Sequence, residues 1–386
     1  MDYQLTEQER QFQKDVADFL QEQIAPRKAG FDQCPRGEIN DRMRENLKTL
    51  ANQNLLGAGI NDDRLDLIQV YLAGEEIARA CASTFLSARS SVYLCGGALA
   101  LFGTPNQKER YIKALKSADK IGAIAYSEDA AGSDISAIGT IARRDGDAWL
   151  ISGKKHIVIN APIADVFVVL AYTEPDAGAE TGMSFFLVER NTPGLSVGEP
   201  LDTMGVRGVP VASLTLANCR CNEILGGAAG NGHQQFEQLM TMGCVGITAL
   251  CVGIGTACME ISTRHAKERR AFGRQIGKFQ DVGFKLSDMF TYNDLGRMLG
   301  IRAACALNNH EDDAVILAAC AKLFASEAVT KIVNWGMQVF AGHGYLKGSD
   351  IERLYRDARF AEICEGTSEI QRALISRHEL DRFQQV

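Results

Sequence analysis

The sequence predicts a multi-domain α+β protein with a helical N-terminal domain, a middle antiparallel β barrel or sandwich, and a C-terminal domain like a four-helix bundle. Apolar residues recur at helical spacing before about residue 119 and again after about residue 230. Between these limits Val, Ile, Phe and Thr gather in short runs separated by turn residues. We therefore expect three domains, at 1–119, 120–229 and 230–386.

The first helix is predicted from its start and stop signals. Thr6 and Glu9 have the spacing of a capping box, in which each side chain bonds to the backbone of the other residue. Apolar residues then fall on one helical face until Pro26, which we expect to end the helix. Two further amphipathic stretches, 67–80 and 107–116, predict helices in the same domain.

The middle domain is predicted from strand-like runs. Residues 141–151 read as a hairpin that turns at Asp145-Gly146. Further strands are expected at 166–172, 183–189 and 212–217. The short spacing leaves no room for helical crossovers between parallel strands, so we expect antiparallel pairing.

The C-terminal domain is predicted from long apolar periodicity. Residues at steps of three or four mark one buried helix: Leu317, Cys320, Phe324, Ala328, Ile332, Trp335 and Val339. The stretches 245–264 and 284–307 are its expected neighbours in an antiparallel bundle. The longest uncharged apolar run, 245–258, is too short to span a bilayer, so no membrane span is expected.

Composition excludes several classes of function. The net charge is -7 and no basic stripe stands out, so nucleic acid is not an expected partner. The 11 cysteines, an odd number, suit a reducing cytoplasm, and Cys219 and Cys221 lack the CxxC spacing of a zinc or redox site. No HExxH motif is present, so we expect no metal site. The first residues lack the basic and apolar regions of a signal peptide, and we expect a cytoplasmic protein.

Five segments, in order along nearly the whole chain, resemble the acyl-CoA dehydrogenase family. The C-terminal segment reads RDAR at 356–359 followed by CEGTSEIQR at 364–372, similar to the family's RDA followed by EGTSEIQR. The others are SEDAAGSD at 127–134, GKK at 153–155, RRAFG at 269–273 followed by Gln280, and QVFAGHGY at 338–345. In combination with the helical, β and helical zones, the five segments are far more specific than any one of them.

The resemblance implies an FAD enzyme that oxidises an acyl thioester. Oxidation of a saturated thioester removes a proton from Cα and a hydride from Cβ, and no side chain accepts hydride, so a cofactor is needed. The family places its base at the glutamate of EGTSEIQR, which is Glu365 here. The resemblance also implies that the Glu365 amide and a ribityl hydroxyl of FAD polarise the thioester carbonyl.

The resemblance assigns the other site residues. Cofactor contacts are implied for Ser127, Ser133, Ile157, Ile159, Arg269, Phe272, Gln280, Gln338, Gly342, Thr367 and Glu369. Substrate contacts are expected from Ser87, Ser91, Ser133, Cys244 and Gly366. In the family, the segment of Arg269 and Phe272 holds the FAD of a neighbouring subunit, which implies a homotetramer. Electron-transfer flavoprotein is the implied electron acceptor.

The sequence departs from the family near the flavin and the thioester. Ile159 stands where a threonine hydroxyl commonly approaches flavin N5, and Ile157 where a tryptophan is common. Cys364 replaces a common tyrosine before the base. Thr241 and Cys244 replace an Asp and an Arg. Gly243 stands where some relatives carry an alternative base, which favours Glu365.

These departures leave other functions open. The first is oxidation of an acyl group that is carried on an acyl or peptidyl carrier protein instead of CoA. The second is an oxygen-using flavin oxidase or monooxygenase of the same fold, favoured by the lost threonine but opposed by Glu365. A non-enzymatic flavin-binding scaffold is the remaining rival. A nicotinamide enzyme is a weak alternative, because 253–255 and 342–344 lack the third glycine of a dinucleotide-binding motif.

Overall fold

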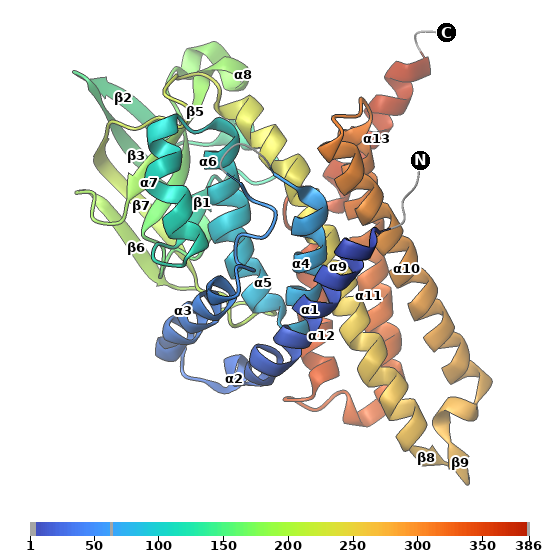
Figure 1. Ribbon diagram of the computed structural model, residues 1–386. Helices are drawn as coiled ribbons and strands as arrows, with labels where there is room; N and C mark the ends of the chain where they lie inside the picture. Colours follow the sequence, from blue (N-terminus) through green and yellow to red (C-terminus); the bar gives the residue numbers. More distant parts are fainter. Residues whose placement is uncertain (1–4, 62–64, 384–386) are drawn as a thin grey trace.

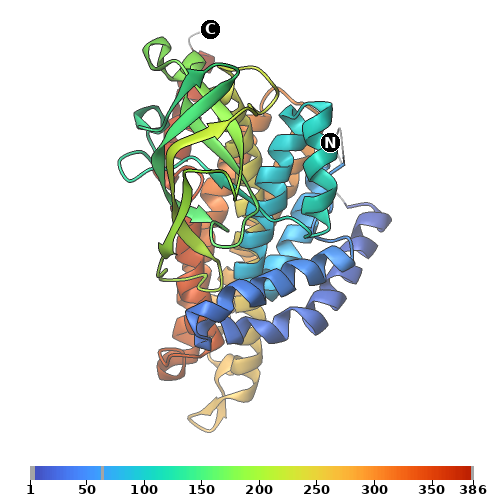
Figure 2. The same ribbon diagram turned by 90° about the vertical axis from the view of Figure 1, so that its left-hand side faces the viewer.

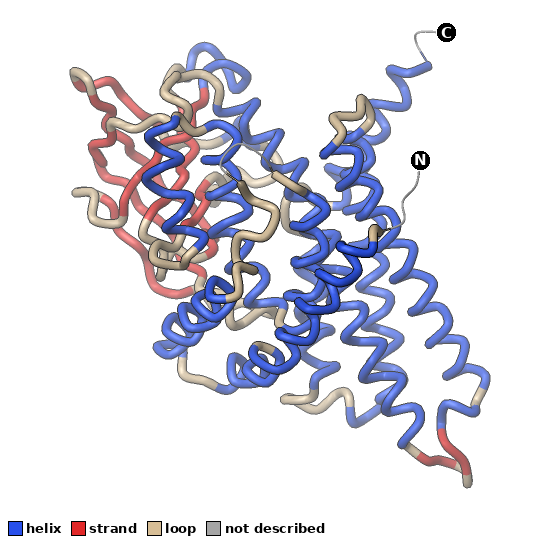
Figure 3. The backbone as a smooth tube through the Cα atoms, viewed as in Figure 1, coloured by secondary structure: helices blue, strands red, loops and turns tan. Residues whose placement is uncertain are grey.

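The fold places a curled β sheet on one side of two layers of helices (Figure 1). The computed structural model describes residues 5–61 and 65–383. Figure 3 shows most of the strands gathered at one side, while the long helices and one short strand pair lie at the other. The expected combination of a helical N-terminal domain, a β domain and a C-terminal helical domain is confirmed.

The N-terminal domain is helical throughout. Its helices are α1 (Glu7–Gln23), α2 (Lys28–Gln33), α3 (Arg36–Asn52), α4 (Leu67–Ala80), α5 (Ala82–Ala88), α6 (Gly97–Phe102) and α7 (Pro105–Lys116). A π-helical segment, Arg89–Gly96, joins α5 to α6. The capping box is present, because the Thr6 side chain accepts from the Glu9 amide and the Glu9 carboxylate accepts from the Thr6 amide. Helix α1 ends at Gln23, before Pro26, which lies in a 3-10 turn.

The β domain is one seven-stranded sheet. Its strands are β1 (Gly122–Ala125), β2 (Ile141–Asp145), β3 (Ala148–Ile159), β4 (Val166–Tyr172), β5 (Met183–Glu189), β6 (Leu195–Pro200) and β7 (Val211–Cys221). The order is β1-β4-β2-β3-β7-β6, with β5 paired to β4. Between β4 and β5 lies the short helix α8 (Gly178–Gly182).

The expectation of purely antiparallel pairing was wrong for two pairs. Strand β1 runs parallel to β4, and one residue pair joins β2 to β4 in parallel. The predicted β2–β3 hairpin is present, and Gly146 takes the positive φ of 62° that its turn needs. This hairpin forms nearly half of the connection from β1 to β4, so a parallel pair arises without a crossover helix.

The C-terminal domain is built on three long helices, α9 (Gly232–Glu268), α10 (Gln280–Asn308) and α11 (Ala314–Phe340). The strands β8 (Arg270–Ala271) and β9 (Arg274–Gln275) form a small hairpin that projects beyond α9 and α10 (Figure 1). Helices α12 (Asp350–Ala358) and α13 (Ser368–Phe383) complete the domain. All three predicted long helices are confirmed.

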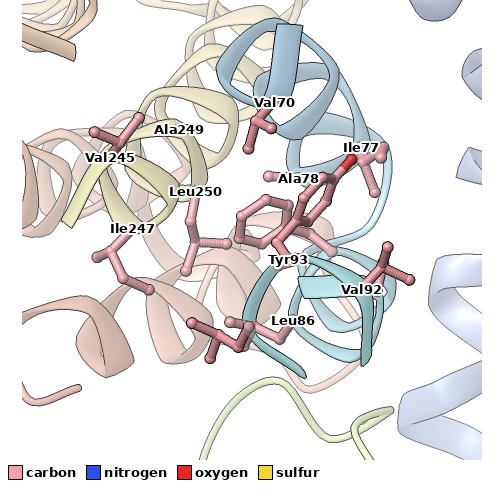
Figure 4. Packing of buried hydrophobic residues seen from close by; sticks show 14 of the residues in the cluster. Val70, Ile77, Ala78, Leu86, Val92, Tyr93, Val245, Ile247, Ala249 and Leu250 are labelled. Carbon is pink, nitrogen blue, oxygen red and sulfur yellow. The ribbon is translucent and has the colours of Figure 1, made fainter. Parts of the chain in front are cut away.

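The core lies where α4, the π-helical segment and α9 meet. Figure 4 shows Val70 and Ile77 of α4 beside Val245, Ile247 and Leu250 of α9. A second apolar cluster fills the curled sheet, where Trp149 packs edge-on against Phe186 at 5.8 Å between ring centroids. In the view of Figure 2 the sheet lies in front of the long helices.

Two helical segments among the described residues have the length and apolar composition of a membrane span, Ala82–Phe102 and Gly232–Glu268. The uncharged apolar run 245–258 lies within the second of these segments. Most of both segments, 89% and 83% of the apolar windows, is buried inside the protein. Burial of this extent is typical of core helices.

The contact between α4 and α9 depends on a glycine. A Cβ at Gly253 would lie 2.7 Å from the backbone nitrogen of Arg79, too close for the two helices to keep their separation. We expect Gly253→Ala to lower the free energy of unfolding by about 1–3 kcal/mol, as overpacking does. In Gly283→Ala, a matched control in α10, the new methyl group meets open space, and the gain in helix propensity should raise stability by up to about 1 kcal/mol. Urea titration of both variants checks the contrast; equal effects would contradict it.

Candidate active site

Glu365 lies in the bend between a 3-10 turn, Arg359–Glu362, and helix α13. It is buried, with 8% of its surface exposed, and its φ of 49° falls in the left-handed region. Such a backbone costs a non-glycine residue about 1 kcal/mol or more and is kept only where the surroundings impose it. Gly366 follows with a φ of 79°, which glycine adopts easily.

Two buried side chains hold this bend. The Lys322 ammonium of α11 donates to the Gly366 carbonyl at 2.6 Å. The Gln371 amide of α13 donates to the Glu365 carbonyl at 3.1 Å. The amide N–H of Glu365, in contrast, donates to no acceptor in the part of the chain that the structure describes. That N–H is therefore available to a ligand.

The Glu365 carboxylate forms a buried ion pair with Arg89, the first residue of the π-helical segment. Nη1 of Arg89 donates to one carboxylate oxygen and Nη2 to the other, in the bidentate geometry that a guanidinium favours. Arg89 is 3% exposed. Its Nη2 also donates to the Gly243 carbonyl of α9 at 3.3 Å.

Glycines on α9 make room for this pair. Gly243 and Gly246 are three residues apart and so lie on one helical face. A Cβ at Gly243 would overlap the Glu365 carboxylate, and one at Gly246 would lie 2.6 Å from Nε of Arg89. The absence of side chains at these two positions is what lets a large cation lie against the helix.

A small cavity adjoins Arg89 and is otherwise apolar or uncharged. Its open volume is about 20 Å³, room for roughly one water molecule. Its lining consists of Leu65, Leu67, Val70, Phe85, Arg89, Tyr93, Leu94, Met242, Gly243 and Gly246. Among these residues Arg89 alone carries a charge.

The residues expected beside the flavin ring meet at the edge of the sheet. The His156 amide donates to the Ser127 carbonyl at 2.9 Å, which brings Ser127 next to Ile157. Ile157 has a φ of 49° and is 58% exposed, an unusual combination for a β-branched residue. Ser90, next to Arg89, donates to the Ile159 carbonyl at 3.3 Å. This chain of contacts joins the strand end to the Arg89–Glu365 pair.

Ser87 and Ser91 make internal hydrogen bonds. The Ser87 hydroxyl donates to Asn160 at 2.6 Å, and the Ser91 hydroxyl accepts from the Gly122 amide at 3.0 Å. Both residues are buried. Within the same stretch it is Arg89 that faces Glu365, so the proposed contacts of the two serines with substrate stay a prediction.

Cys244 and Tyr126 lie close to Glu365. Burial, reinforced by the neighbouring carboxylate of Glu365, raises the pKa of Cys244 to about 12. The same two causes raise the pKa of Tyr126. Both side chains are therefore neutral at physiological pH and surround the Glu365 carboxylate with polar but uncharged groups.

A second buried ion pair supports the strand that carries Ile157 and Ile159. Lys155 of β3 is fully buried and its ammonium lies 2.8 Å from the Glu128 carboxylate and 3.0 Å from the Tyr126 carbonyl. Burial lowers the pKa of Lys155 to about 8, and Glu128 opposes that shift. Glu128 also accepts from the amides of Gly139 and Thr140, at 2.7 and 3.0 Å. The pair fixes the loop 126–134 against the end of β3.

The RDAR segment at 356–359 connects domains. Arg356 donates to both Asp32 oxygens at 3.2 Å, and the Asp357 carboxylate accepts from the Val206 amide at 2.5 Å. Burial raises the pKa of Asp357 to about 6. These contacts tie α12 to α2 and to the loop after β6.

Several predicted cofactor residues lie far from Glu365 in the same chain. Arg269 and Phe272 follow the end of α9, about 26 residues, or roughly 40 Å of helix, beyond Gly243. Phe272 is 95% exposed, with a φ of 48°. Five other predicted cofactor residues are also exposed to solvent: Ser133, Gln280, Gln338, Gly342 and Glu369. One bound cofactor at Glu365 could not also touch the hairpin of its own chain.

The residues present fit an FAD at the Glu365 end. Thr367 caps helix α13, with its hydroxyl accepting from the Ile370 amide at 3.4 Å, and a helix N-terminus attracts phosphate. The Ser368 hydroxyl beside it is buried without a hydrogen-bond partner in the described chain, so it can serve a ligand. The exposed apolar face of Ile157 suits a flat aromatic ring.

Three residues of this site were not predicted from the sequence: Arg89, Glu128 and Lys322. Arg89 carried a signal, because it is the only charged residue between Ala82 and Phe102. Lys322 stands within the apolar periodicity of α11, where a charge needs a buried partner. Glu128 and its partner Lys155 stand in two segments that resemble the family, 127–134 and 153–155, but no local pattern indicated that the two residues pair.

Comparison with known proteins gives matches over nearly the whole chain. Three domain models of one family match: acyl-CoA dehydrogenase, N-terminal domain, at 6–119; middle domain, at 123–219; and C-terminal domain, at 230–380. A probable acyl-CoA dehydrogenase, YngJ, from Bacillus subtilis is 37% identical over 98% of this chain and 99% of its own.

Two solved structures of similar proteins have the same fold as this chain. The butyryl-CoA dehydrogenase of Megasphaera elsdenii superposes with a TM-score of 0.91 at 29% identity, covering 98% of this chain and 100% of that one. The prolyl acyl carrier protein oxidase AnaB gives a TM-score of 0.88 at 30% identity, covering 97% and 99%.

Proposed function

Because the chain belongs to the acyl-CoA dehydrogenase family, whose members are flavin oxidoreductases that use FAD, we propose that it dehydrogenates an acyl thioester between Cα and Cβ. The acyl carrier that we favour is CoA. The product is the corresponding 2-enoyl thioester. FAD, when bound, supplies the acceptor for the hydride that leaves Cβ.

In this proposal Glu365 takes the proton from Cα. The carboxylate is buried in a bend whose backbone is held by Lys322 and Gln371, so its position is fixed while its side chain can turn. Both oxygens accept from Arg89 in the resting ion pair, and in this proposal the carboxylate turns from Arg89 toward Cα to accept the proton.

The observation that carries the proposal is the combination of a buried carboxylate and a free amide in one residue. Enolate charge that develops on the thioester oxygen needs a preorganised donor. The N–H of Glu365 is such a donor, since it has no acceptor among the described residues. One residue thus provides the base and part of the oxyanion site.

The test is anaerobic mixing of the FAD-loaded enzyme with a panel of saturated acyl-CoA thioesters. We expect loss of the oxidised-flavin absorbance, with one 2-enoyl thioester formed per flavin reduced. A flavin that stays oxidised with every thioester of the panel, on CoA or on a carrier protein, would show the proposed reaction to be wrong.

We also propose a homotetramer in which the β8–β9 hairpin of one subunit contacts the FAD of another, with electron-transfer flavoprotein as the acceptor of the electrons. The exposed Phe272 and its distance from Glu365 support this arrangement. Phe272→Ala should leave the folded subunit as stable as before but raise the Kd for FAD by about 10-fold or more. Equilibrium dialysis measures the Kd, and an unchanged value would remove Phe272 from the cofactor site. Phe290→Ala, another exposed aromatic, is the control.

A second candidate is oxidation of an acyl group on a carrier protein. The likeness to the carrier protein oxidase AnaB, and the uncharged Thr241 and Cys244 where the family commonly has charges, favour it. Matched acyl groups on CoA and on a phosphopantetheinylated carrier protein would discriminate the two. Faster flavin reduction by the CoA thioester would favour the first candidate.

A further inference from the structure

The charge of Arg89 takes no part in the proposed proton and hydride transfers. Arg89 is a fully buried guanidinium whose carboxylate partner is Glu365, the proposed base. No other carboxylate is hydrogen-bonded to it in the described chain. The remaining contact is the Gly243 carbonyl, which carries no net charge.

The reaction takes this partner away. When Glu365 turns to the α-carbon it gives up at least one of its two bonds to Arg89, and when it accepts the proton it becomes neutral. The guanidinium cannot lose its own charge at physiological pH. A buried charge that loses its partner is strongly destabilising. An uncharged alkyl acyl group would therefore leave Arg89 without an anion at the point where the proton is transferred.

No described residue near Arg89 offers a second anion to replace the Glu365 carboxylate. The cavity beside Arg89 is lined by aliphatic, aromatic and glycine residues together with Met242 and Tyr93. The Cys244 thiol nearby is kept protonated by burial, which raises its pKa to about 12. The Lys322 ammonium on the other side of the bend has the same sign as Arg89 and cannot stabilise it. An anion carried by the ligand would supply the missing partner.

We propose that Arg89 recognises a carboxylate on the acyl group, so that the preferred substrate is the monothioester of a short dicarboxylic acid. This inference rests on the proposed function and names its substrate class. The substrate carboxylate replaces Glu365 on the two guanidinium nitrogens, and Glu365 is thereby released toward Cα. Binding of the correct substrate and activation of the base are then one event.

The geometry limits the length of the acyl group. Arg89 reaches the same carboxylate that must reach Cα, so the substrate carboxylate binds only a few atoms from the reacting carbons. Gly243 and Gly246 hold the guanidinium against α9 at this depth. Succinyl and glutaryl groups are of suitable length; long-chain diacids are not.

The experiment compares glutaryl-CoA with hexanoyl-CoA and butyryl-CoA on the FAD-loaded enzyme, with the anaerobic rate of flavin reduction as the readout. Glutaryl-CoA and hexanoyl-CoA have similar size and differ in charge. We expect kcat/KM for glutaryl-CoA to exceed that for either uncharged thioester by roughly 100-fold or more, since a site built for a polar group rejects analogues that lack it. This comparison needs no variant.

Variants of Arg89 provide the second measurement. Arg89→Met retains length without charge, and we expect it to lose activity with glutaryl-CoA and to gain activity with hexanoyl-CoA. Arg89→Lys retains the charge without the bidentate geometry and should keep the preference for glutaryl-CoA at a lower rate. Arg143→Met, on the exposed face of β2, is the control and should change neither rate. Flavin absorbance and thermal unfolding confirm that each variant is folded and loaded.

The outcomes separate this inference from the proposed function. Reduction of the flavin by hexanoyl-CoA or butyryl-CoA at least as fast as by glutaryl-CoA in the wild type would overturn the role of Arg89 but leave the dehydrogenation in place. An equal loss with charged and uncharged thioesters in Arg89→Met would likewise show that Arg89 only positions Glu365. Failure of every thioester to reduce the flavin would overturn the proposed function itself.

Discussion

Glu365→Gln should slow reduction of the flavin by substrate about 10²–10⁴-fold, the usual contribution of a general base, while FAD stays bound. The amide has nearly the shape of the carboxylate and keeps the backbone N–H, so the thioester can still bind. It cannot take the α-proton. Stopped-flow absorbance of the oxidised flavin measures the rate, and a bleaching rate equal to that of the wild type would show that Glu365 is not the base.

A double variant controls for the loss of the ion pair. Glu365→Gln alone leaves Arg89 buried without an anion, which destabilises a protein by about 3–5 kcal/mol. Glu365→Gln combined with Arg89→Met has a neutral pocket and should recover most of that stability. It should stay as slow as the single variant with butyryl-CoA. Recovery of activity along with stability would mean that the single variant was slow because it was misfolded.

Glu128→Gln should lower the free energy of unfolding by about 3–5 kcal/mol and weaken FAD binding as well. Lys155 would be left as a fully buried ammonium with no carboxylate, and its pKa, already lowered to about 8 by burial, would fall further. The loop 126–134 would lose a strong acceptor for the Gly139 and Thr140 amides. Urea unfolding and the Kd for FAD measure the two effects.

The matched control for this variant is Glu199→Gln, at an exposed position of β6 in the same sheet. It should change stability by no more than about 0.5 kcal/mol, as surface substitutions do. If Glu128→Gln has an effect of the same size, the Lys155–Glu128 pair is not needed to hold the loop. If stability falls but the Kd for FAD is unchanged, the loop does not contribute to the cofactor site.

Much of the fold could be predicted because local signals and burial agreed. Helix α4 and the strands β4 and β5 begin and end where their apolar patterns predicted. The pairing of β1 with β4 could not be predicted in the same way. The direction of β4 relative to β1 depends on which strand β4 pairs with after the β2–β3 hairpin. No local sequence pattern indicates that partner.

Site residues could be predicted from the sequence only where they stand in a segment that resembles the family. Glu365 was found through the segment 364–372, and its burial and left-handed backbone are properties that the motif does not state. Arg89 was not predicted as a site residue because its role depends on Glu365, which is 276 residues away in the sequence. A lone arginine in the apolar run from Ala82 to Phe102 signals a buried partner but cannot say which one.

The central claim, a proton from Cα to Glu365 and a hydride from Cβ to the flavin, is tested most directly by isotopic substitution. The measurement is the anaerobic rate of flavin reduction with thioesters that carry deuterium either at Cα or at Cβ. We predict that each substitution slows the reduction phase, because both C–H bonds break in that phase. Equal rates for labelled and unlabelled thioesters at both positions would contradict the account.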